Sequence, residues 1–167
     1  MQPCFLTATQ AAERIRDGKL TSEALVRSCL ERIRVRDPDV RAWAHLDPKL
    51  AIAQARELDK RPIDGPLHGL PFGVKDMIDT GDQPTSYNSP LYQGHRPAKD
   101  AGCVAVVRCN GALILGKTDT VEFASGERKP LTRNPWNFAH TPGGSSSNAA
   151  VADAINVKTP RAELAAR

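Results

Sequence analysis

The chain has 167 residues, of which 40% are hydrophobic and 25% are charged, and its formal net charge is +4. This composition is typical of a globular domain with its own core, and no apolar run reaches the roughly 18 residues that a membrane span needs. Basic and acidic residues are interspersed, only 5% of residues are aromatic, and the first residues lack the apolar stretch of a signal peptide. We therefore expect a cytoplasmic protein that binds neither nucleic acid nor membrane.

The first expected helix follows Thr7. Thr7 and Gln10 have the Ser/Thr-x-x-Gln spacing of a capping box, in which each side chain accepts a hydrogen bond from the backbone N–H of the other residue. Gly18 can adopt the left-handed conformation that ends many helices. The sequence therefore predicts a short helix between these two signals.

Two more helices are expected in the N-terminal part. One begins after Thr21 or Ser22 and ends at Asp37-Pro38, because a residue that precedes proline disfavours helical geometry. The other covers residues 48–60, which have proline near their start and strong helix formers after it. Residues 41–46, between the two, form a candidate strand.

Residues 61–100 are rich in Gly, Pro, Asp and Ser, and only residues 70–76 within them suit a short strand. A loop of this length in a compact domain is usually functional or disordered. A helix is expected over residues 100–111, a strand buried on both faces over residues 112–117, and the start of another helix within residues 118–125. Helix and strand joined by short connections indicate an α/β fold.

Residues 111–118 satisfy the P-loop pattern G-x-x-x-x-G-K-[ST]. A P-loop needs a strand, then a glycine-rich loop of exposed N–H groups, then a helix. Here the four variable positions are Ala-Leu-Ile-Leu, which are themselves typical of a strand, so no loop is left to surround a phosphate. We interpret the match as a strand with Lys117 at its end, and a nucleotide-binding protein as the less favoured alternative.

The cysteines and histidines do not form a metal-binding pattern. No two cysteines have Cys-x-x-Cys spacing and no histidine stands at a zinc-ligand interval from them. We therefore expect no metal or other cofactor, and four buried, reduced thiols at Cys4, Cys29, Cys103 and Cys109.

Lys75 and the Gly/Ser run at residues 143–147 are the candidate functional residues. Lys75 follows a nearly apolar segment, and desolvation of its amine would favour the neutral form, which can act as a general base for a serine hydroxyl. The run can be a flexible linker, or an ordered loop that brings Ser145 and backbone N–H groups to a reacting group. The residues alone leave both interpretations open.

Three blocks, residues 65–82, 100–124 and 133–150, resemble the N-terminal part of the amidase signature family in order and spacing. The resemblance extends from about Leu6 to Asp153. It implies an α/β fold with a mixed sheet covered by helices, and cofactor-free hydrolysis of a carboxylic amide through a Ser-Ser-Lys triad. It makes Lys75 the lysine of that triad, and Ser145 the bridging serine that follows a cis peptide bond.

The C-terminal residues depart from the family pattern. Asn148 replaces a usual glycine, and residues 154–167 lack the apolar strand and the second Gly-Gly-Ser segment that carries the family's nucleophile. We therefore divide the chain into residues 1–153, the N-terminal part of the amidase signature domain, and a non-family tail at residues 154–167. A chain truncated in this way is expected to be inactive alone and to leave an open sheet edge, which favours a homodimer.

The expected partner is a small-molecule amide, and the residues that bind it are unknown. One alternative is the glutamine-hydrolysing subunit of a tRNA-dependent amidotransferase, which also belongs to the family that the chain resembles. The other, from a different class of protein, is a non-catalytic remnant.

Overall fold

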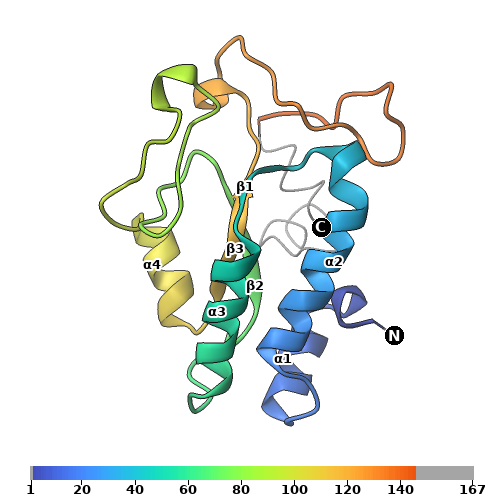
Figure 1. Cartoon of the computed structure of the whole chain (residues 1–167), viewed down its shortest axis with the longest axis vertical. Helices are drawn as coiled ribbons and strands as arrows, with labels where there is room; N and C mark the ends of the chain where they lie inside the picture. The colour runs from blue at the N-terminus through green and yellow to red at the C-terminus, as the bar shows by residue number, and fades with distance from the viewer. Residues whose placement is uncertain (1, 146–167) are drawn as a thin grey trace, which may run out of the picture.

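The computed structural model describes residues 2–145, which form an α/β fold as the sequence predicts (Figure 1). Three strands form one sheet, and four α-helices and three short 3₁₀ turns surround it within the described residues. In chain order these elements are η1 Pro3–Phe5, α1 Ala8–Arg16, α2 Ser22–Val40, β1 Trp43–Leu46, α3 Pro48–Asp59, β2 Pro71–Lys75, η2 Pro90–Tyr92, α4 Gly102–Cys109, β3 Leu113–Thr118 and η3 Glu122–Ala124.

The capping box predicted at the start of α1 is present. Thr7 Oγ1 accepts a hydrogen bond from the N–H of Gln10 at 3.1 Å, and Gln10 Oε1 accepts one from the N–H of Thr7 at 2.9 Å. Gly18 follows the helix with φ of 68°, which is the left-handed conformation expected for it. Local side-chain chemistry therefore defines both ends of α1.

The prediction that the second helix ends at Asp37-Pro38 is wrong. Helix α2 includes Pro38 and continues to Val40. It ends at Arg41, whose φ of 56° is left-handed and whose N–H donates to the Asp37 carbonyl at 2.7 Å. Because Pro38 lies in the last turn, its missing N–H costs the helix one hydrogen bond and does not break it.

The prediction of a helix that begins within residues 118–125 is also wrong, since only the 3₁₀ turn η3 forms there. Phe123 and Ala124 have φ of 45° and 63°. These left-handed values are incompatible with a continuing right-handed helix. The segment instead turns back, and the Phe123 N–H donates to the carbonyl of Tyr87 at 3.0 Å.

Strand β3 is the central strand of the sheet, whose order is β1-β3-β2. It is antiparallel to β1 and parallel to β2, so the sheet is mixed. All six residues of β3 are buried, which confirms the predicted strand buried on both faces. The polar residues Lys117 and Thr118 are buried as well, which its apolar run does not explain. The open edge is therefore not at β3, because β3 pairs on both sides; β1 and β2 are the edge strands of the sheet that the structure describes.

Helices pack around this sheet, and Figure 1 shows the strands between α4 on one side and α2 on the other. The main core joins apolar side chains of α1, α2, α3 and β3, and α4 contacts β3 as well. Cys4 and Cys29 are buried in this core, as expected. Cys103 and Cys109 are exposed, contrary to expectation, because they lie on the outer surface of α4.

Candidate active site

Lys75 and Ser145, 70 residues apart in the sequence, lie side by side in the structure. Lys75 is the last residue of β2, where it pairs with Thr118 of β3. Its Nζ donates a hydrogen bond to Ser145 Oγ at 3.2 Å. The Gly144–Ser145 peptide bond is cis. An amine and a hydroxyl at this distance can exchange a proton.

The backbone of Ser145 is held by the segment that follows β3. Thr120 is fully buried, and its hydroxyl donates to the carbonyl of Ser145 at 3.2 Å. The Thr120 carbonyl in turn accepts a hydrogen bond from Asn88 Nδ2 at 2.7 Å. Sequence reasoning gave neither Thr120 nor Asn88 a role, since threonine and asparagine in loops have no distinctive pattern.

Asp119 connects residues 131–132 to this segment by hydrogen bonds. Its carboxylate accepts hydrogen bonds from the N–H groups of Thr120 at 2.8 Å and Leu131 at 2.7 Å, and from the Thr132 hydroxyl at 3.3 Å. Burial raises the pKa of Asp119, and these donors oppose the rise because they stabilise the charged form. Asp119 therefore ties the end of β3 to residues 131–132, in the segment that leads toward Ser145.

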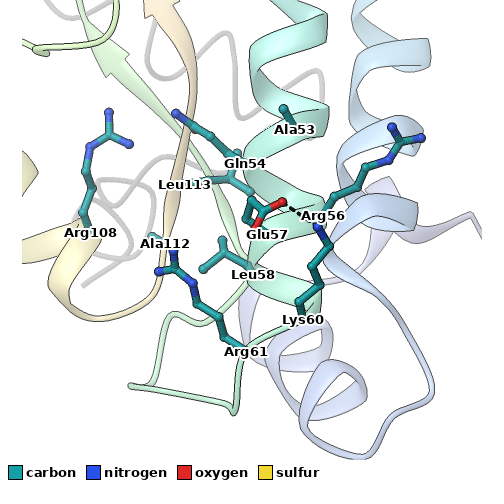
Figure 2. Close-up of a pocket in the computed structure, with 10 residues that line it drawn as sticks. All are labelled: Ala53, Gln54, Arg56, Glu57, Leu58, Lys60, Arg61, Arg108, Ala112 and Leu113. Carbon is teal, nitrogen blue, oxygen red and sulfur yellow. Dashed lines mark hydrogen bonds and ion pairs between the residues drawn. The ribbon is translucent and has the colours of Figure 1, made fainter.

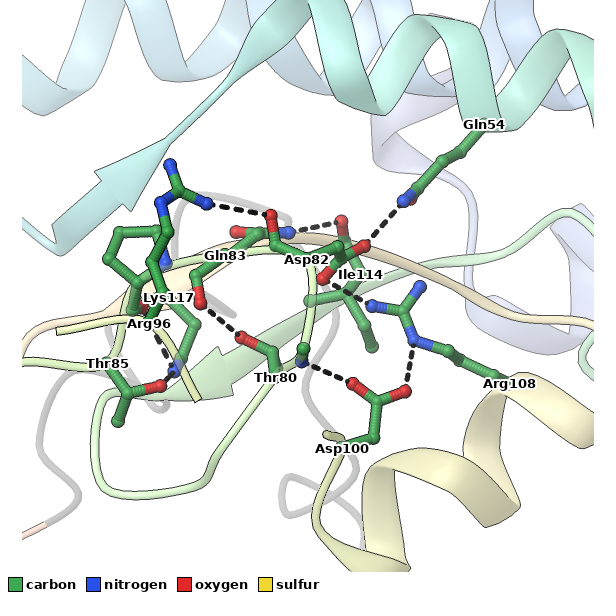
Figure 3. Close-up of polar contacts among 12 residues, drawn as sticks. Gln54, Thr80, Asp82, Gln83, Thr85, Arg96, Asp100, Arg108, Ile114 and Lys117 are labelled. Carbon is green, nitrogen blue, oxygen red and sulfur yellow. Dashed lines mark hydrogen bonds and ion pairs between the residues drawn. The ribbon is translucent and has the colours of Figure 1, made fainter. Parts of the chain in front are cut away.

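Lys117, the lysine of the P-loop pattern, is completely buried inside β3. Its Nζ donates to Thr85 Oγ1 at 2.6 Å (Figure 3). It also donates to the carbonyl of Ile78 at 2.8 Å. Residues 113–118 are strand, so they provide no loop of free N–H groups for a phosphate. The strand interpretation of the pattern is confirmed.

A cavity of about 690 Å³ lies between α3 and α4 (Figure 2). Neither Lys75 nor Ser145 lines it. Arg56, Lys60 and Arg108, three of the four cationic residues that line it, form ion pairs with carboxylates of the same chain. Most of its positive charge is therefore neutralised internally, and the cavity does not identify the substrate-binding residues.

Two further observations are restricted to the described part of the chain. Residues 2–145 contain no group of three or more His, Cys, Asp or Glu side chains placed to hold a metal ion. None of the helices among them is long and apolar enough to cross a membrane. Asn148 and the tail predicted at residues 154–167 lie outside the described residues.

The comparisons with known proteins agree on one family. The family model named Amidase matches residues 24–158. A glutamyl-tRNA(Gln) amidotransferase subunit from Chloroflexus aggregans is 37% identical over 157 residues, which are 89% of this chain and 32% of that protein. The putative amidase AmiD of Mycobacterium bovis is 38% identical over 159 residues, which are 91% of this chain and 34% of that protein.

A solved structure shows the same relationship in three dimensions. The X-ray structure of native peptide amidase from Stenotrophomonas maltophilia superimposes with a TM-score of 0.85 and 37% sequence identity. The match covers 92% of this chain and 35% of the peptide amidase. This chain thus spans about a third of the length of the relatives that it matches. The fold, the sequence similarity and the family match together show that the chain belongs to the amidase family.

Proposed function

We propose that this chain provides the lysine and the bridging serine of an amide-hydrolysing site. The observation that carries the proposal is the 3.2 Å hydrogen bond between Lys75 Nζ and Ser145 Oγ. Membership of the amidase family supplies the reaction class, and the pairing of these two side chains supports the Ser-Ser-Lys mechanism. The substrate class is a carboxylic amide, with water as the final acyl acceptor.

In the proposed mechanism, neutral Lys75 accepts the proton of Ser145 while Ser145 Oγ takes the proton of a second serine. The oxygen of that second serine attacks the amide carbonyl carbon. The C–N bond then breaks, and the proton passes back through Ser145 to the departing amine. Water releases the acyl group by the same path in reverse, so both groups end in their starting protonation states.

The nucleophile has to come from outside residues 2–145 in this proposal. The resemblance to the family puts it in a Gly-Gly-Ser segment about two dozen residues after Ser145, and the 167 residues contain no Gly-Gly-Ser other than residues 143–145. The 167-residue chain alone should therefore hydrolyse no amide above background. Turnover by this chain that both Lys75→Ala and Ser145→Ala abolish would contradict the requirement for an added nucleophile.

A chimera tests the proposal itself. Residues 2–145 of this chain replace the matching third of the Stenotrophomonas maltophilia peptide amidase, which supplies the remainder of the fold. We expect the chimera to release ammonia from a peptide amide, and Lys75→Ala and Ser145→Ala each to reduce kcat by about 10³-fold or more. Lys60→Ala, at an exposed position, is the matched control. A folded chimera that turns over equally well without Lys75 would refute the assignment.

A second candidate is the glutamine-hydrolysing role within a tRNA-dependent amidotransferase. It is favoured by the 37% identity to the Chloroflexus aggregans amidotransferase protein. In this role glutamine is the amide, and the released ammonia passes to glutamyl-tRNA(Gln) with the help of partner subunits. Glutamine turnover that requires both partner subunits and charged tRNA would select this candidate, whereas turnover without them would select a free-standing amidase.

A further inference from the structure

Asp76 and Lys117 form an ion pair in the interior, directly beside the proposed site. Asp76 is 2% exposed and Lys117 is 0% exposed. Lys117 Nζ lies 3.5 Å from Asp76 Oδ1. Asp76 follows Lys75 in sequence, and Lys117 pairs with Val74 across the sheet. Burying a charged pair is costly, because both charges lose their contacts with water. We therefore expect this pair to have a role beyond stability.

Lys117 contacts two separate segments of the loop that follows Lys75. Its ammonium donates to the carbonyl of Ile78, near the start of this loop, at 2.8 Å, and to Thr85 Oγ1, seven residues later, at 2.6 Å. Thr85 is fully buried, like Lys117 itself. Burial lowers the pKa of Lys117, and the charge of Asp76 opposes this effect. The two hydrogen bonds of Lys117 therefore connect residues 78 and 85 of this loop.

Asp76 holds the next residues of the same loop. Its carboxylate accepts hydrogen bonds from the N–H of Ser86 at 3.1 Å and from the Ser86 hydroxyl at 2.5 Å. Its own N–H donates to the carbonyl of Thr118 at 2.9 Å, and its carbonyl accepts from the N–H of Tyr87 at 3.1 Å. Asp76, the residue after Lys75, is thus hydrogen-bonded both to β3 and to residues 86–87.

The loop then reaches Ser145 from the other side. Asn88 donates to the carbonyl of Thr120, and the hydroxyl of Thr120 donates to the carbonyl of Ser145. Consecutive hydrogen bonds therefore lead from Asp76 through residues 86–88 and Thr120 to Ser145. The side-chain contact between Ser145 and Lys75 closes this path into a ring.

We propose that Asp76 and Lys117 are a positioning pair that sets the distance between Lys75 Nζ and Ser145 Oγ. They act through the backbone and through residues 86–88 and 120, and not on the reacting atoms. The inference rests on the proposed function for its catalytic meaning. Its structural content is narrower: without the buried pair, the contact between Lys75 and Ser145 is lost.

The experiment measures that contact directly, in the 167-residue chain, by NMR titration of ¹³C-labelled lysine, with the Lys75 signal assigned through Lys75→Arg. In the parent chain, Ser145→Ala should lower the Lys75 titration midpoint by about 0.5–1 pH unit, because the hydroxyl that accepts a hydrogen bond from the ammonium is lost. The double variant Asp76→Asn/Lys117→Met removes both buried charges together. In that background, Ser145→Ala should shift the midpoint by less than half as much.

Two further variants make the result decisive. Lys60→Met removes an exposed, ion-paired lysine and should keep the full shift. Thr85→Val removes only the hydroxyl that accepts from Lys117, so it introduces no unpaired charge, and it should reduce the shift partially even if the double variant fails to fold. A pair with only a structural role would lower the melting temperature of these variants and leave the shift intact.

The proposal is overturned if the folded double variant keeps the full shift, if Thr85→Val keeps it where the double variant does not fold, or if the parent chain shows no shift. None of these measurements requires amide turnover. A chimera without amidase activity would therefore contradict the proposed function while leaving the positioning role standing.

Discussion

Gly116 of β3 pairs with Leu46 of β1, and Gly116→Ala tests the packing of the sheet. A Cβ at this position would lie 2.6 Å from the carbonyl oxygen of His45, 2.8 Å from Trp43 Cε3 and 2.9 Å from Leu46 Cδ1. Ordinary contacts of a Cβ begin at 3.4 Å. The nearest atom belongs to the backbone, so a side-chain rotation does not relieve the clash, and β1 has to move by several tenths of an ångström.

Gly116→Ala is expected to lower the free energy of unfolding through overpacking and through weaker hydrogen bonds between β1 and β3. Extra atoms in a well-packed interior usually cost about 1–3 kcal/mol, and a weakened β1–β3 hydrogen bond adds about 1 kcal/mol. Alanine recovers about 0.5–1 kcal/mol by restricting the unfolded chain. We therefore expect Gly116→Ala to lower the free energy of unfolding by about 2 kcal/mol, which corresponds to a fall of ~4–8 °C in melting temperature.

Urea unfolding followed by circular dichroism measures this effect. Gly102→Ala is the matched control, because its Cβ would meet no atom within 4 Å and it lies at the start of α4. The control should change the free energy of unfolding by less than ~0.5 kcal/mol. The reasoning is refuted if Gly116→Ala is as harmless as Gly102→Ala. Because β2 lies on the other side of β3, the contact between Lys75 and Ser145 should survive in the Gly116 variant.

Three other predictions concern separate features. Hydrogen bonds from Arg56 and Arg27 lower the pKa of Glu23 from 4.5 to about 2, so the stability that Glu23 contributes is present above pH 4.5 and is lost as the pH falls toward 2. The difference in melting temperature between the parent chain and Glu23→Gln should shrink over that interval; a constant difference would argue against the two arginines as its cause. Lys117→Ala should leave ATP binding in calorimetry as negligible as in the parent chain, and micromolar binding that this change destroys would restore the P-loop interpretation. Thr7→Ala should cost about 1 kcal/mol in urea unfolding through the loss of the α1 cap, and an unchanged midpoint would show that the capping box contributes nothing.

Local signals in the sequence predicted most of the elements, because each signal acts within a few residues. The capping box of α1 and the apolar run of β3 are of this kind, and both are present. The signal at Pro38 failed because it depends on position within the helix: a proline in the last turn removes one hydrogen bond, whereas one in the middle also obstructs the preceding turn. The order of the strands was beyond any local signal, since pairing depends on contacts between distant segments.

The candidate site also depends on contacts between distant segments, which local signals do not predict. No periodicity relates Lys75 to Ser145, because they are 70 positions apart in the sequence, with loop, helix and strand between them. Their association was predicted only through the resemblance to a family. The residues that hold them, Asp76, Thr120 and Asn88, had no signal at all, because hydrogen bonds to backbone carbonyls and N–H groups impose little constraint on the surrounding sequence.

The P-loop pattern at residues 111–118 has a physical explanation that does not involve phosphate. Gly111 has φ of 90°, and a Cβ there would lie 2.4 Å from the carbonyl oxygen of Asp64. At Gly116 a side chain would clash with β1, and Lys117 forms a buried ion pair with Asp76. Three unrelated requirements, a left-handed turn, a close strand and a buried ion pair, thus produce the spacing by which nucleotide-binding loops are recognised. Since none of the three exposes backbone N–H groups, the pattern and the chemistry usually inferred from it are independent in this chain.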